Sequence, residues 1–130
     1  MNKKTYNMRI AVAQLNTTVG DFKGNLEKVE KSIREAVKSE ADIIIFPELV
    51  ICGYPPEDLL FNKAFLYECS QYLKKAGSMT EGITALIGCP ETSGSRKDNG
   101  LYNTAFIFQN GEEVGRYRKI HLPNYSVFDE

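Results

Sequence analysis

A short apolar run that ends in a proline and an acid constrains this chain most. Ile43 to Phe46 joins three β-branched residues to an aromatic one, which is typical of a buried strand. Pro47 ends the run, because proline has no N–H to give to a sheet ladder. Glu48 therefore directly follows a buried strand, at the kind of sheet edge where α/β proteins place ligands in a cleft. Taken alone, Glu48 is more simply interpreted as a solvated loop acid or a helix-capping acid.

Patterns on both sides of this run predict alternating strands and helices. Met8–Leu15 predicts a first strand with both faces covered, and Ala41–Phe46 predicts a second. Between them, apolar residues recur at helical spacing from Leu26 to Val37, with Asn25 as the expected N-cap. A strand, helix and strand of these lengths predict a parallel pair.

The second half of the chain predicts a further helix, a strand and a hairpin. The expected elements are a helix opening at Glu57-Asp58, a helix from Asn62 with Gly77 just past its end, a strand over Thr84–Cys89 ended by Pro90, and strands Tyr102–Gln109 and Glu112–Lys119. Asn110-Gly111 joins the last two strands, and Asn-Gly is the strongest two-residue hairpin signal.

The predicted fold class is therefore α/β, with a mixed sheet and two helices on one face. Two helices cannot cover both faces of about five strands. The other face needs a cover, either from more of the same domain or from a partner. A second copy of the chain is one such partner, so we expect a homo-oligomer.

Composition narrows the class of protein. The chain has 130 residues, 16 basic and 17 acidic, with a net charge of −1, so a single domain without a basic face is expected and nucleic acid and anionic membranes are poor partners. Residues 1–7 lead into no apolar segment and predict a disordered lead-in before a domain over residues 8–130, not a secretory signal. The 3 cysteines and 1 histidine predict reduced cytoplasmic thiols and no structural metal site.

A second chemical signal lies at the end of the last predicted strand. Lys119 follows that strand as Glu48 follows an earlier one. If the two strand ends face the same way, a carboxylate and an ammonium meet in one cleft, within about 6 Å of each other. Tyr54, in the rigid turn after Glu48, is expected over the same cleft. An ordinary ion pair or an exposed lysine is the alternative.

Several motifs in order resemble one known family. They are Phe46-Pro47-Glu48-Leu49, Gly53-Tyr54-Pro55-Pro56-Glu57-Asp58-Leu59-Leu60, Gly88-Cys89-Pro90-Glu91, Tyr102-Asn103-Thr104-Ala105, Tyr117-Arg118-Lys119 and Leu122-Pro123-Asn124-Tyr125-Ser126-Val127-Phe128-Asp129-Glu130. Together they resemble the nitrilase, or carbon–nitrogen hydrolase, superfamily, and within it the glutaminase domains of glutamine-dependent NAD synthetases. Ser126 departs from the usual glycine. The resemblance implies the first half of an α-β-β-α sandwich.

The resemblance also implies a catalytic set of Glu, Lys and Cys. The thiolate attacks an amide carbon, the carboxylate moves protons, and the ammonium stabilises the oxyanion. By match of motifs, Glu48 is the general base and Lys119 the oxyanion stabiliser. Tyr54 and Tyr125 match tyrosines of the glutamine pocket, and Glu130 matches a second glutamate near the catalytic centre.

The nucleophile is the member of the set that the motifs do not supply. The family places it after the lysine motif, and none of Cys52, Cys69 and Cys89 stands at that place. We therefore expect this chain to be part of a glutaminase domain, inactive alone, with glutamine as substrate. The glutaminase step implies no cofactor. ATP and magnesium are implied only for a separate synthetase domain. A stand-alone amidase and a noncatalytic interaction module are the alternatives.

Overall fold

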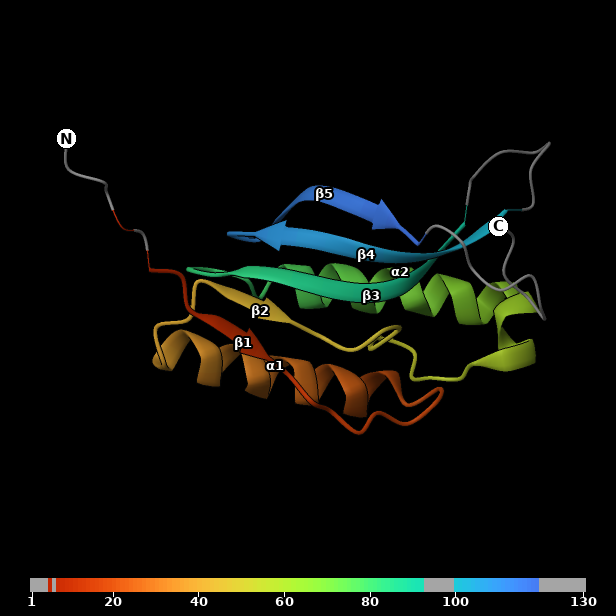
Figure 1. Ribbon diagram of the computed structural model, residues 1–130. Coiled ribbons are helices and arrows are strands. Elements are labelled where there is room, and N and C mark those ends of the chain that lie inside the picture. The colour runs from red at the N-terminus through yellow and green to blue at the C-terminus, as the bar shows by residue number, and fades with distance from the viewer. Residues whose placement is uncertain (1–4, 6, 93–99, 120–130) are drawn as a thin grey trace.

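The computed structural model describes residues 5, 7–92 and 100–119. Its elements are β1 (Ile10–Val12), α1 (Phe22–Lys38), β2 (Ile43–Ile45), the 3-10 helix η1 (Glu57–Phe61), α2 (Lys63–Gly77), β3 (Thr84–Thr92), β4 (Leu101–Gln109) and β5 (Glu112–Arg118) (Figure 1). Most of the predicted lead-in lies outside the described residues. None of the described helices is long and apolar enough to cross a membrane.

The strands form one mixed sheet in the order β1-β2-β3-β4-β5. β1, β2 and β3 pair in parallel, and β3, β4 and β5 pair antiparallel. The turn between β4 and β5 has positive φ at both Asn110 (51°) and Gly111 (85°), as a tight hairpin requires. This connectivity brings the carboxyl ends of β2, β3 and β5 to the same edge as the start of β4.

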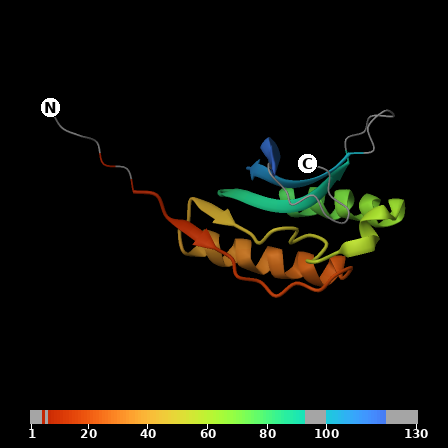
Figure 2. The same ribbon diagram turned by 45° about the vertical axis from the view of Figure 1, so that its right-hand side comes forward.

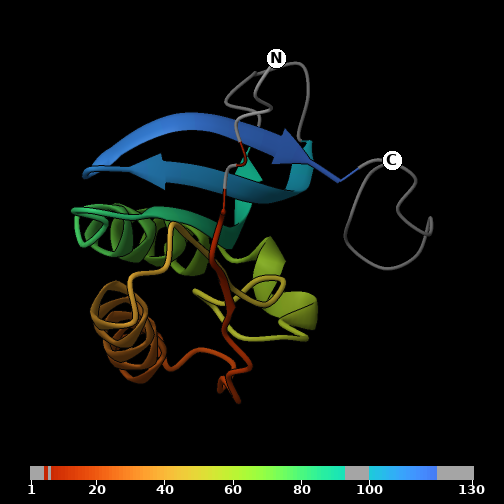
Figure 3. The ribbon, with the colours of Figure 1, turned by 60° about the vertical axis from the view of Figure 1, so that its left-hand side comes forward.

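Both helices lie side by side on one face of the sheet, as predicted (Figures 2 and 3). Phe22 of α1 joins them, with its ring centroid 5.2 Å from that of Phe65 and 5.4 Å from that of Tyr72 on α2. The buried core between the helices and the sheet includes Val29 of α1 and Ile87 of β3, both fully buried. The fold class is therefore α/β with a five-stranded mixed sheet and two helices.

The opposite face of the sheet carries an apolar row that is in register across four strands. Val12, Ile45, Leu86 and Ile107 pair in sequence from β1 to β4. Val12 is 67% exposed and Ile10, on the same face, is 51% exposed. The prediction that the first strand has both faces covered is therefore wrong within the described residues, because both helices pack on the other side. We call this surface the open face.

The predicted N-cap of the first helix is also wrong. α1 begins four residues earlier than expected from Asn25, because the Asp21 side chain caps its first turn. Asn25 is fully buried inside the helix and bonds the backbone of Thr18 in both directions, as well as the carbonyl oxygen of Ile51. Its polar side chain serves tertiary packing and does not start the helix.

Several predicted boundaries change for physical reasons. Pro90 does not end β3, because β2 pairs with β3 only as far as Leu86 and no N–H is needed there on the side of β2. The predicted strands Met8–Leu15 and Ala41–Phe46 are shorter, three residues each. Glu57 opens the short 3-10 helix η1, and the α-helix starts only after its N-cap, Asn62.

Gly77 is the last residue of α2 and not the residue past its end, which corrects the predicted C-terminus. The physical reason is packing against β4. A Cβ at Gly77 would lie 2.3 Å from Cε1 of Phe108, a side chain of the core. The glycine therefore permits close approach of helix and sheet.

Replacing Gly77 with alanine is expected to destabilise the protein, although alanine normally favours a helix. The overpacking against Phe108 should lower the free energy of unfolding by about 1–3 kcal/mol, measured by denaturant unfolding. The matched control is Gly115→Ala in β5, where a Cβ would meet Ile107 at an ordinary 3.6 Å. A Gly77→Ala protein at least as stable as the wild type would contradict this account of the helix–sheet contact.

Candidate active site

The turn after β2 places Glu48 at the sheet edge. β2 ends at Ile45, and the chain then turns with Leu49 in the left-handed region at φ 54°, a conformation that costs a non-glycine residue about 1–2 kcal/mol. Gly88 of β3 accommodates the turn, because a Cβ there would lie 2.6 Å from the backbone nitrogen of Leu49 and 3.1 Å from the carbonyl oxygen of Pro47. Strain held in place by surrounding structure is common at functional sites.

Lys119 reaches the same place from the end of β5. Its backbone N–H donates to the carbonyl oxygen of Asn103 on β4 at 2.9 Å. Its Nζ donates to Oε1 of Glu48, also at 2.9 Å. The two side chains are 46% and 41% exposed, so the pair faces solvent from the sheet edge. The predicted approach of Glu48 and Lys119 at one end of the sheet is therefore confirmed.

A cleft of about 270 Å³ surrounds this pair on the open face. Its lining residues are Ile45, Phe46, Pro47, Glu48, Leu86, Gly88, Asn103, Thr104, Ala105, Tyr117 and Lys119. Tyr54 is not among them, so the expectation that it sits over this cleft is not met, and its role in binding substrate stays a prediction. Tyr125 and Glu130 lie outside the described residues.

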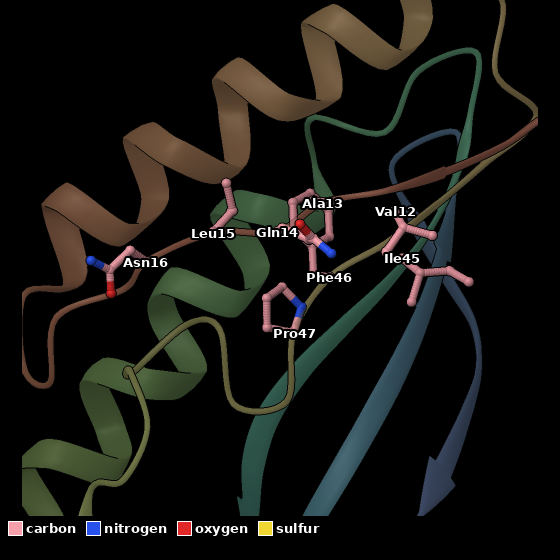
Figure 4. A pocket seen from close by; sticks show the side chains of 8 residues that line it. All are labelled: Val12, Ala13, Gln14, Leu15, Asn16, Ile45, Phe46 and Pro47. Carbon is pink, nitrogen blue, oxygen red and sulfur yellow. The ribbon is translucent and has the colours of Figure 1, made fainter.

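A larger hollow of about 510 Å³ lies beside β1 and the end of β2 (Figure 4). It is lined by Val12, Ala13, Gln14, Leu15, Asn16, Ile45, Phe46 and Pro47. None of these side chains is a titratable acid, base or thiol. Of these two hollows, only the cleft around Glu48 and Lys119 contains groups that can move protons, and it is the candidate active site.

All three cysteines of the chain are fully buried and none lines the cleft. A hydrogen bond with Cys69, together with burial, raises the pKa of the Cys52 thiol. The hydrogen bond with Cys52 acts the other way on Cys69, but a hydrogen bond with Cys89 and burial outweigh it and raise the pKa of Cys69 as well. Structural cysteines that are buried are inert, so the burial of all three supports the prediction that none of them is the nucleophile.

A buried carboxylate on β3 was not predicted from the sequence. Glu91 of β3 is 8% exposed and accepts hydrogen bonds from Thr104, Arg116 and Arg118. The hydrogen bond from Arg118, supported by those from Thr104 and Arg116, lowers the pKa of Glu91 to about 2 against the cost of burial. The signal in the sequence was the spacing of the two arginines, since residues two apart on a strand share a face.

The described residues contain no group of three or more His, Cys, Asp or Glu side chains that could hold a metal ion. What the cleft offers is one carboxylate, one ammonium and an apolar wall. A carboxylate can accept a proton and an ammonium can stabilise a developing oxyanion. A mixed sheet backed by two helices, with a carboxylate and an ammonium in a cleft at its edge, is typical of enzymes that act on a carbonyl group.

The chain belongs to the carbon–nitrogen hydrolase family, whose sequence model matches residues 9–130. It is 46% identical over 125 residues to the glutamine-dependent NAD(+) synthetase of Thermotoga maritima and 44% identical over 126 residues to that of Xanthomonas campestris. These alignments cover 95% and 96% of this chain but only 21% and 22% of the relatives. The chain therefore spans about a fifth of the length of the curated relatives it matches.

Solved structures with the same fold include enzymes of two kinds. A glutamine-dependent NAD(+) synthetase from Cytophaga hutchinsonii superposes with a TM-score of 0.83 at 28% identity, covering 90% of this chain and 20% of that protein. An amidase from a Nesterenkonia species superposes with a TM-score of 0.75 at 22% identity, covering 95% of this chain and 48% of the amidase. The second likeness shows the fold alone.

Replacing Glu91 with glutamine tests the buried ion network through its pH dependence. The pKa of Glu91 is lowered from 4.5 to about 2, so its stabilisation is complete above about pH 4.5 and is lost as the pH falls towards 2. At pH 7 we expect Glu91→Gln to lower the free energy of unfolding by about 1–3 kcal/mol, and the difference from wild type to shrink below pH 4.5.

The control for this measurement is Glu30→Gln, which breaks an exposed ion pair with Arg34 on α1. Such surface pairs contribute at most about 1 kcal/mol. The difference in free energy of unfolding between wild type and Glu91→Gln is the test. If it stays constant from pH 7 to pH 2.5, the charge of Glu91 is not what stabilises the contacts among β3, β4 and β5.

Proposed function

We propose that this chain forms part of the glutamine-hydrolysing site of a glutamine-dependent NAD synthetase. The observation that carries the proposal is the Glu48–Lys119 pair, with Nζ 2.9 Å from Oε1 in a cleft at the sheet edge. The pair occurs in a chain that is 46% identical to a glutamine-dependent NAD(+) synthetase. In this proposal the substrate is the side-chain amide of glutamine and the product is ammonia.

The two groups have complementary roles in amide hydrolysis. Glu48 takes the proton of a thiol nucleophile and later activates the water that cleaves the thioester. Lys119 donates to the carbonyl oxygen and stabilises the charge that develops on it. Among the described residues, both donors to Glu48, Asn103 and Lys119, bind its Oε1, so Oε2 is the oxygen assigned to proton transfer.

The nucleophile in this proposal is a cysteine from outside these 130 residues, since Cys52, Cys69 and Cys89 are buried. Tyr54, Tyr125 and Glu130 are proposed to contribute to the glutamine pocket. The ammonia passes to a synthetase domain that uses ATP and magnesium, whereas the hydrolysis step uses no cofactor. Reduced thiols fit a cytoplasmic protein.

A second proposal concerns what covers the open face of the isolated chain. The in-register row through Val12, Ile45 and Leu86 presents apolar side chains over several strands, and apolar area removed from water contributes roughly 25 cal/mol per Å². We propose that two copies of the 130-residue chain associate through this face, as a noncatalytic pair.

Ammonia release from glutamine tests the proposed function. The 130-residue chain alone should release none, and the full-length protein should release ammonia with Glu48→Gln and Lys119→Met each lowering kcat by about 100-fold or more. Glu30→Gln, on the exposed side of α1, serves as the matched control and should leave kcat unchanged. Turnover by the 130-residue chain that disappears in Cys52→Ala would make Cys52 the nucleophile and contradict the assignment.

Light scattering at about 10–50 μM, a range set by ordinary affinities, tests the association of the 130-residue chain. The expected mass is that of a dimer. Val12→Lys should shift it to the monomer by placing a charge on the open face. Val37→Lys on α1, where the valine is 42% exposed, is the control and should leave the dimer intact. A monomeric wild type under these conditions would overturn this proposal.

A further inference from the structure

Asn103 contacts both members of the Glu48–Lys119 pair. It lies near the start of β4, is 6% exposed, and lines the cleft. We infer that Asn103 is a positioning residue for the reaction: its side chain orients the Glu48 carboxylate while its backbone fixes Lys119. This inference rests on the proposed function only for its effect on turnover.

The side chain of Asn103 holds Glu48. Its Nδ2 donates a hydrogen bond to Oε1 of Glu48. An ionised carboxylate only accepts hydrogen bonds, so the amide nitrogen, and not the amide oxygen, is the group that must face it. The donor is fixed because Asn103 pairs with Pro90 of β3 within the ladder between β3 and β4.

The backbone of Asn103 holds Lys119. Its carbonyl oxygen accepts the N–H of Lys119 at 2.9 Å, which extends the pairing of β4 with β5 by one residue beyond Arg118. A single buried residue therefore sets the backbone position of the cation and the orientation of the anion.

A second donor is needed because Lys119 alone constrains Glu48 weakly. The lysine side chain is flexible and 46% exposed, and the glutamate side chain is 41% exposed. Ordering such chains costs conformational entropy, which offsets much of the gain from an exposed ion pair. The buried Asn103 amide adds a donor from a rigid strand. Oε1 of Glu48 then accepts two hydrogen bonds, which fixes the direction in which Oε2 points.

Turnover of the full-length protein gives the first test. Asn103→Ala is expected to lower kcat for glutamine hydrolysis about 10-fold or more with KM changed less than about 3-fold, as expected for misplacement of a reacting group. Asn103→Asp should be slower still, because it keeps the shape but sets a like charge against Glu48. A kcat for Asn103→Ala or Asn103→Asp equal to that of the wild type would overturn the inference.

The control is Thr80→Ala, another buried polar residue whose hydroxyl bonds the turn after β4. Six residues of β4, 104–109, lie between Asn103 and that turn, so Asn103 and Asn110 are roughly 23 Å apart at 3.3 Å per step. All variants are compared at equal folded fraction. Loss of kcat in Thr80→Ala equal to that in Asn103→Ala would assign the effect to stability and overturn the inference.

Amine labelling of Lys119 gives a readout that needs no turnover. With an amine-reactive acetylating reagent and Lys31 of α1 as internal reference, Glu48→Gln should raise the labelling rate of Lys119 by removing the carboxylate that its Nζ binds. Asn103→Ala should raise it in the same direction, at least about 2-fold, and Thr80→Ala should not. An unchanged rate in Asn103→Ala overturns the inference. A raised labelling rate in Asn103→Ala, together with a wild-type full-length protein that releases no ammonia from glutamine, would support the inference and overturn the proposed function.

Discussion

The turn at Pro47, just after β2, is the constraint on which the site depends. Because proline gives the ladder no N–H, the chain leaves the sheet there, and the left-handed Leu49 turns it against Gly88 of β3. Glu48 is thereby set beside β4 and β5 rather than beyond the sheet. The hairpin between β4 and β5 returns Lys119 to the same edge. Backbone conformation, more than side-chain packing, brings the two charges together.

The two faces of the sheet have different roles: one packs against the helices and forms the core, and the other, the open face, carries the cleft. Core residues such as Val29 and Ile87 lie between the helices and the sheet, whereas Val12 is 67% exposed on the open face. The cleft also opens on that face, with Leu86 and Tyr117 in its wall. Any layer that covers the apolar row would also exclude water from the cleft, which would strengthen the interaction between Glu48 and Lys119.

The features that follow from local sequence rules were predictable. The hairpin at Asn110-Gly111 and the convergence of Glu48 and Lys119 need only turn chemistry and strand ends. The roles of Asn25, Gly77 and Glu91 were not predictable, because each depends on a tertiary contact: a backbone segment around Thr18, the ring of Phe108, or two arginines on β5. Asn103 stood in a recognised motif, but its double contact appears only when β4 and β5 are paired.

The most direct measurement is a crystal structure of the full-length Glu48→Gln protein with glutamine bound. The account predicts the glutamine side-chain amide in the cleft, with its carbonyl oxygen within hydrogen-bond distance of Lys119 Nζ, about 3 Å. It also predicts a cysteine from outside these 130 residues facing the amide carbon. Glutamine bound elsewhere, with Lys119 directed away from its amide, would contradict the assignment of this cleft as the hydrolytic site.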